Sequence, residues 1–180
     1  MRCFLGIPLP VDCRAAIRQA WSVPDHERPH LKLSDPGQWH LTLAFFGEIQ
    51  YANSIKLVEM IGRALETPPE GALGVTRIQT FPAKKPTYYV ALCEPEQDAK
   101  WRQCVAQIVD MASLIAPQVD RKPWIPHVTL ARSRPGHVLE PFEMSLNGIG
   151  WVPLYATLYQ SELTPAGPKY TPLHDFRLNA

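Results

Sequence analysis

The stretch that decides the fold is Trp39-His40-Leu41-Thr42-Leu43-Ala44-Phe45-Phe46-Gly47, and a second stretch, Pro126-His127-Val128-Thr129-Leu130-Ala131-Arg132, repeats its plan 87 positions later. Each places a histidine two residues before a threonine, within a short apolar run that favours a β-strand. In a strand, residues i and i+2 point to the same face with their Cα atoms roughly 6.6 Å apart. We therefore predict two strands, over 39–46 and 127–133, each presenting a histidine and a threonine on one face.

The chain around these strands repeats at the same offset. Each copy has a short apolar strand, at 2–7 or 88–93, then a helix-period segment, then the histidine strand. Two copies are too few for a stacked solenoid, which needs at least three units to bury a continuous core. We therefore predict an internal duplication that forms a pseudo-twofold pair of lobes. Identical residues at this offset include Leu5 and Leu92, Pro8 and Pro95, Pro36 and Pro123, and Ala44 and Ala131.

The remaining elements are predicted from periodicity and from helix-breaking residues. Apolar residues at helical spacing predict a helix from Val11 to about Val23, a second from Asn53 or Ser54 to before Pro68, and a third that starts at Pro95-Glu96. A strand is predicted over 71–81, a turn at Gly148–Gly150 and a last clear strand over 151–163. No linker separates two domains, so we predict that residues 1–180 form a single domain.

Composition limits the kinds of partner. The formal net charge is only +1, with 46% hydrophobic and 19% charged residues, so no polybasic surface for duplex nucleic acid or a membrane is indicated. Any contact with a polyanion must be local. The candidate cations are Lys84 with Lys85, Arg121 with Lys122, and Arg132 with Arg134, and each pair can also be read as a solvated surface patch.

The cysteines and the N-terminus indicate a cytoplasmic protein. The four cysteines form no C-x-x-C pair, and each lies in or beside an apolar segment, so we expect buried free thiols. The first apolar run is too short for a signal peptide, and no stretch approaches the roughly 18 apolar residues that span a bilayer. We therefore expect no membrane association.

The paired histidines suggest acid–base catalysis. A lone histidine in a strand is more often a hydrogen-bonded structural residue, and a threonine there can reflect β-propensity alone. Two equivalent His–Thr pairs change this balance, because His40 and His127 could face each other across the groove between the lobes. One neutral and one charged imidazole can then accept and donate protons. Thr42 and Thr129 would donate to an anionic substrate. A metal site is disfavoured, since no carboxylate or cysteine accompanies either histidine in ligand spacing.

With these motifs the sequence resembles the two-histidine phosphoesterases, and its flanking residues look like the bacterial RNA 2′,3′-cyclic phosphodiesterase branch, long called 2′-5′ RNA ligase. The resemblance extends from the Arg2-Cys3-Phe4 strand to Ser161-Glu162-Leu163 and Gly167-Pro168-Lys169-Tyr170. It implies an α+β fold of two intertwined lobes, with antiparallel sheets lining a central cleft and helices outside. It also implies that the enzyme needs no metal or cofactor.

The resemblance further implies a reaction and a set of site residues. The reaction is hydrolysis of an RNA 2′,3′-cyclic phosphate to a 2′-phosphate, with His127 as base and His40 as acid, and with weak reversible 2′-5′ ligation. Thr42 and Thr129 would hold phosphate oxygens, and Arg132 would contact the phosphate region. Phe45 matches a position near the base, although strict alternation from His40 places Phe46 on the histidine face, so a bulge is needed to seat Phe45.

The sequence is also compatible with two alternatives to RNA-end hydrolysis. The substrate could be another 2′-linked nucleotide, such as an ADP-ribose cyclic phosphate or a 2′-5′ oligoadenylate. The protein could also bind RNA ends without turnover. We expect a monomer and take His30, His137 and His174, which have no partner motif, as surface or structural residues.

Overall fold

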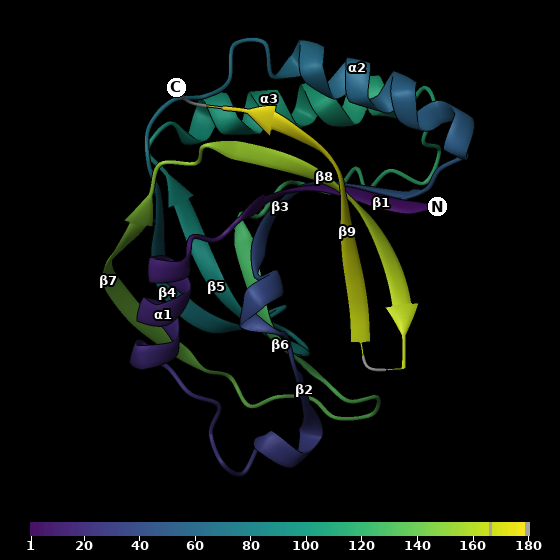
Figure 1. Ribbon diagram of the computed structural model, residues 1–180. Helices are drawn as coiled ribbons and strands as arrows, with labels where there is room; N and C mark the ends of the chain where they lie inside the picture. Colours follow the sequence, from purple (N-terminus) through teal and green to yellow (C-terminus); the bar gives the residue numbers. More distant parts are fainter. Residues whose placement is uncertain (166, 179–180) are drawn as a thin grey trace.

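The computed structural model describes residues 1–165 and 167–178, which form two antiparallel sheets and three α-helices (Figure 1). This confirms the predicted α+β class. The strands are β1 (Arg2–Pro8), β2 (Leu31–Leu33), β3 (His40–Glu48), β4 (Leu73–Phe81), β5 (Tyr88–Pro95), β6 (His127–Ser133), β7 (Glu143–Trp151), β8 (Tyr155–Thr164) and β9 (Gly167–Arg177). The helices are α1 (Val11–Ala20), α2 (Ser54–Ala64) and α3 (Asp98–Ala112), and short 3₁₀ turns lie at Arg28–His30, Pro36–Gln38 and Tyr51–Asn53.

The two signature strands belong to different sheets. The four-stranded sheet has the order β3-β1-β8-β9, and the five-stranded sheet has the order β2-β6-β5-β4-β7. In both sheets the histidine strand pairs with the first strand of its own copy, β3 with β1 and β6 with β5. β3 and β6 also contact each other. The two His–Thr motifs are therefore brought together where the sheets meet.

Each copy contributes its helix to the other sheet. α1 follows β1 but packs against β7 of the five-stranded sheet, whereas α3 follows β5 but packs against β3 of the four-stranded sheet. α2 lies beside α3 on the same side of the molecule (Figure 1). The buried stripes explain this packing, because one face of each helix is apolar. The buried side chains are Cys13 and Ile17 on α1, and Trp101, Cys104, Val105, Ile108 and Ala112 on α3.

The segments that precede the signature strands are also exchanged. β2, which precedes β3, pairs with β6, and the segment before β6 lies along β3. There the Asp120 N–H donates to the Phe45 carbonyl at 2.9 Å, and Trp124 Nε1 donates to the Thr42 carbonyl at 2.8 Å. These contacts satisfy backbone groups that an edge strand would leave open. We propose that the chain, of which residues 166 and 179–180 lie outside the described part, is one domain of two intertwined lobes.

The sheet register corrects one detail of the duplication. His40 pairs with Pro8 and His127 pairs with Leu92, so equivalent positions of β1 and β5 are 84 residues apart (92 − 8). The prediction that Leu5 matches Leu92 at an offset of 87 is therefore wrong for the first strands. Strand pairing fixes equivalence through backbone hydrogen bonds, and a few identical apolar letters do not report it.

Several element boundaries also differ from the prediction. α1 ends at Ala20, since Trp21 already has extended backbone, and Pro24 disfavours helical backbone at Val23. The expected turn at 148–150 lies inside β7, where the register jumps from Val75↔Ile149 to Arg77↔Ser145 and the extra residues form a bulge. α3 starts at Asp98 because Pro95 still belongs to β5. The last predicted strand begins later, at Tyr155, and β2 and β9 were not predicted.

The core runs through both lobes. It includes fully buried side chains from both sheets and from α2 and α3, among them Phe46, Leu57, Tyr89 and Trp101. All four cysteines are free and buried, which confirms the expectation from their positions. Within the described residues, no helix has the length and apolar character required to cross a membrane.

Candidate active site

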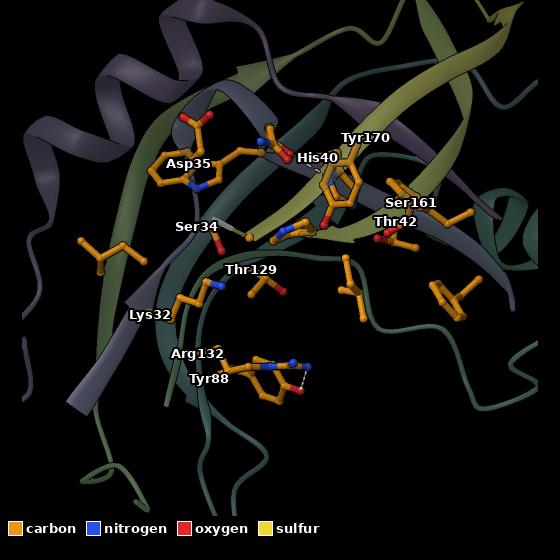
Figure 2. A pocket seen from close by; sticks show the side chains of 18 of the residues that line it. Lys32, Ser34, Asp35, His40, Thr42, Tyr88, Thr129, Arg132, Ser161 and Tyr170 are labelled. Atoms are coloured by element: carbon orange, nitrogen blue, oxygen red, sulfur yellow. Dashed lines mark hydrogen bonds between the residues drawn. The ribbon is translucent and has the colours of Figure 1, made fainter. Parts of the chain in front are cut away.

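Both His–Thr motifs open onto one cavity of about 460 Å³, between the signature strands and the β8–β9 hairpin (Figure 2). His40, Thr42, His127 and Thr129 all line it and are half-buried. The structure therefore brings together the two His–Thr pairs, which are 87 positions apart in the sequence. Phe45 and Arg132, the two other predicted site residues, line the same cavity.

A bulge in β3 decides which phenylalanine faces the cavity. Gly6 pairs with Thr42 but Leu5 pairs with Ala44, so Leu43 is an extra residue. Leu43 and Ala44 are both buried, and the alternation restarts one residue later. Phe45 therefore shares the face of His40 and Thr42, while Phe46 points into the core with 0% exposure. β3 therefore contains the bulge that was predicted to be necessary for Phe45 to reach the histidine face.

β6 contains the same bulge at the equivalent place. Val90 pairs with Thr129 and Tyr89 pairs with Ala131, so Leu130 is the extra residue. Leu130 and Ala131 are both buried, and Arg132 returns to the cavity face. The residue five positions after each histidine is thus re-aimed at the site, as an aromatic ring in one lobe and a guanidinium in the other.

Both imidazoles are oriented by the backbone in the same way. Nδ1 of His40 lies 2.8 Å from the Gln38 carbonyl oxygen, and Nδ1 of His127 lies 2.7 Å from the Ile125 carbonyl oxygen. A carbonyl can only accept a hydrogen bond, so each Nδ1 carries the proton. Nε2 of each ring is therefore the atom left to exchange a proton with a ligand.

Aromatic rings pack against the His40 imidazole. Phe4 stacks on it with ring centroids 4.7 Å apart, and Tyr170 meets it edge-on at 5.3 Å. Burial lowers the pKa of His40, the Gln38 hydrogen bond raises it and the His127 charge lowers it, with a net downward shift. Gly6 makes room for the ring, since a Cβ there would lie 3.0 Å from His40 Cδ2. A glycine inside a strand is a sequence signal for such a close approach.

An arginine lies over an aromatic ring in each lobe. Arg2 stands 4.8 Å above the Phe45 ring, and Arg132 stands 4.9 Å above the Tyr88 ring and donates a hydrogen bond to the Tyr88 hydroxyl. These cation–π contacts hold both guanidinium groups over aromatic rings that line the cavity. Arg2, Tyr88, Phe4 and Tyr170 were not singled out from the sequence, because nothing local marks a strand residue as facing a cleft.

The cavity is positively charged although the chain is almost neutral. Arg2, Lys32 and Arg132 line it against one carboxylate, Asp35, whose Oδ1 accepts the Gly37 N–H at 2.9 Å. Lys32 reaches toward the β8–β9 hairpin. Its Nζ lies 3.6 Å from the position that a Cβ atom on Gly167 would occupy. This local excess of cations suits an anionic ligand.

The other candidates from the sequence lie elsewhere. Lys84, Lys85, Arg121 and Lys122 are exposed and outside the cavity, and Arg134 donates to the Pro29 carbonyl. His30, His137 and His174 do not line the cavity either. Across residues 1–165 and 167–178, no group of three or more histidine, cysteine or acidic side chains is placed to hold a metal ion.

The fold and cavity define a class, a two-lobed α+β protein whose paired His–Thr strands share one basic pocket. Comparison with known proteins gives the family. Residues 9–147 match the model of the 2′-5′ RNA ligase superfamily, so the chain belongs to this superfamily of two-histidine phosphoesterases.

Individual relatives are similar over nearly the whole chain. An RNA 2′,3′-cyclic phosphodiesterase of Thermus thermophilus is 33% identical, over 99% of this chain and 90% of the relative. The crystal structure of TT0787, also of Thermus thermophilus, has 29% identity and a TM-score of 0.80, covering 99% of this chain and 98% of that one. The apo crystal structure of E. coli LigT, 23% identical with the same two coverages and a TM-score of 0.76, shows the same fold.

Proposed function

We propose that this protein hydrolyses RNA 2′,3′-cyclic phosphate ends to 2′-phosphates, using two histidines and no metal or cofactor. The observation that carries the proposal is the matched pair of imidazoles in one basic cavity, each with Nδ1 bound to a backbone carbonyl and Nε2 left for the ligand. The name of the Thermus thermophilus relative supports the same reaction.

The proposed reaction needs one base and one acid. Following the family assignment, Nε2 of His127 accepts a proton from water as its oxygen attacks phosphorus. Nε2 of His40 donates a proton to the 3′ oxygen as the bond between phosphorus and that oxygen breaks, leaving a 2′-phosphate. Burial lowers the pKa of His40, and a bound phosphate anion would raise it toward the protonated form that an acid requires.

The other cavity residues would bind the substrate. The Thr42 and Thr129 hydroxyls, two residues from their histidines on the same strand face, would donate to the non-bridging oxygens as charge develops. Arg132, held by Tyr88, would offset the phosphate charge, and Phe45, beneath Arg2, would stack with the terminal base. Weak 2′-5′ ligation would follow if an RNA 5′-hydroxyl took the place of water.

We also propose that the protein acts as a cytoplasmic monomer. The six predicted site residues line one cavity of a single chain, which fits a monomeric enzyme. The four free, buried cysteines fit a reducing compartment. Size-exclusion chromatography with light scattering tests the oligomeric state.

The deciding experiment is turnover of a short RNA ending in a 2′,3′-cyclic phosphate, in EDTA, with the phosphate position of the product identified. We expect a 2′-phosphate from the wild type, and rate losses of several orders of magnitude in His40→Ala and His127→Ala with an unchanged circular dichroism spectrum. His174→Ala, which removes an exposed imidazole outside the cavity, is the matched control.

The other outcomes identify the alternatives. Turnover of a 2′-5′ oligoadenylate or an ADP-ribose cyclic phosphate, but not of the RNA end, would transfer the chemistry to a different 2′-linked substrate. Binding of the RNA end without any turnover would show a recognition module instead of an enzyme. Loss of activity in EDTA that Mg²⁺ or Zn²⁺ restores would contradict the metal-independent mechanism.

A further inference from the structure

Tyr170 is a cavity residue to which the proposed mechanism gives no role. It lies on β9, opposite Ser161 of β8, so it comes from neither signature strand. Figure 2 shows its ring reaching into the cavity, with the phenol oxygen directed inward. An element outside the two signature strands therefore places a further polar group beside His40.

The ring of Tyr170 is held in place, but its hydroxyl is not engaged. The ring packs edge-on against His40 at 5.3 Å and against Phe4 at 4.9 Å. Within residues 1–165 and 167–178, the hydroxyl has no hydrogen-bond partner, although the side chain is half-buried. Two aromatic contacts thus fix a donor whose own partner must be a ligand or water.

The charge around Tyr170 suits an anion as that partner. Burial raises the pKa of Tyr170, and the charges of Arg132 and Arg2 lower it by less, so the phenol is protonated at neutral pH. A protonated phenol can donate a hydrogen bond to an oxyanion, and the raised pKa keeps Tyr170 in this protonated form despite the two arginine charges. Thr42 and Thr129 line the same cavity from the two signature strands.

We propose that the Tyr170 hydroxyl is a third donor to the cyclic phosphate, beside those of Thr42 and Thr129, and contacts one of its two non-bridging oxygens. This inference rests on the proposed function. A donor fixed where charge develops in the transition state lowers the barrier more than it strengthens substrate binding. Tyr170 would then contribute to kcat more than to KM.

The test compares Tyr170→Phe with Tyr159→Phe. Each change removes one hydroxyl from a tyrosine whose ring lies near His40, but Tyr159 does not line the cavity. We expect Tyr170→Phe to lower kcat by roughly 10²-fold with a much smaller change in KM, as for the loss of one oxyanion donor. Tyr159→Phe should stay close to wild type.

Sulfur substitution separates a phosphate contact from a packing role. The two diastereomers of a 2′,3′-cyclic phosphorothioate replace one non-bridging oxygen each. Sulfur at the oxygen that Tyr170 contacts should slow the wild type, relative to the oxygen substrate, more than it slows Tyr170→Phe. Sulfur at the other oxygen should slow both proteins equally. Equal penalties in both proteins for both diastereomers, or a Tyr170→Phe rate equal to that of the wild type, would overturn the inference while leaving the proposed function intact. A wild type inactive on the oxygen substrate would overturn the proposed function, and this inference with it.

Discussion

A buried carboxylate outside the cavity holds one wall of it. Glu27 is 2% exposed, its Oε2 lies 2.6 Å from His137 Nε2, and its Oε1 accepts the Glu140 N–H at 3.1 Å. His137 also stacks on His30 at 4.3 Å. These contacts join the segment before β2 to the loop after β6. Because Lys32 of β2 lines the cavity, Glu27 supports the site indirectly.

The stability that Glu27 provides can be estimated from these contacts. Glu27→Gln keeps the shape but removes the charge and turns an NH₂ group toward one of the two donors. A hydrogen bond to a charged group contributes about 1.5–3 kcal/mol, and the partial exposure of His137 reduces the value of that pair. We expect a loss of about 2 kcal/mol in the free energy of unfolding at pH 7, equivalent to roughly 4–8 °C in Tm.

The effect should depend on pH in one direction. Burial raises the pKa of Glu27. The hydrogen bond from the Glu140 N–H and the hydrogen bond and charge of His137 together lower it by more, so the net shift of the pKa is downward. A carboxyl whose pKa is lowered by folding stabilises the protein above its unfolded pKa, about 4.3. That stability is lost as the pH falls through the folded value. The difference between wild type and Glu27→Gln should therefore be largest near neutrality and shrink below about pH 4.

Urea unfolding between pH 3.5 and 7 measures this difference. The matched control is Glu140→Gln, which breaks a His26–Glu140 pair whose side chains are 64% and 78% exposed. We expect the control to cost less than about 1 kcal/mol. A Glu27→Gln loss no larger than the control's, or one that is constant across this pH range, would refute the reasoning. Glu27→Gln should also raise KM, because β2 is less firmly held.

Three further perturbations test the geometry of the site. Phe46→Ala should cost about 3–5 kcal/mol in urea unfolding with little change in KM, whereas Phe45→Ala should mainly raise KM; equal effects of both on stability would contradict the bulge in β3. In an NMR titration, His40 should have a pKa below its usual 6.5 in the free protein, because burial disfavours the cation, and a higher one when inorganic phosphate occupies the cavity; no change with phosphate would contradict its placement. Trp124→Phe removes the bond to the Thr42 carbonyl and should cost about 1 kcal/mol with a fall in kcat; unchanged unfolding would show that this tie between the lobes is unimportant.

The sequence located the candidate catalytic residues because both motifs are local. A histidine and a threonine two residues apart in a strand share a face whatever the rest of the fold does. The apolar spacing that predicted α1, α2 and α3 depends likewise on residues within a few turns. The absence of C-x-x-C pairs indicated free thiols, and all four are free in the structure.

Only the tertiary structure decided how these parts form a site. The bulges that bring Phe45 and Arg132 to the cavity depend on the pairing of β3 with β1 and of β6 with β5, which no local pattern encodes. The exchange of helices and of the segments before the signature strands depends on how the two lobes pack together. Tyr170 reaches the cavity because β9 pairs with β8, whose other neighbour is β1, so its position depends on the pairing of strands from the two ends of the chain. Side-chain periodicity depends on the local backbone, whereas the pairing of strands depends on the packing of the whole core.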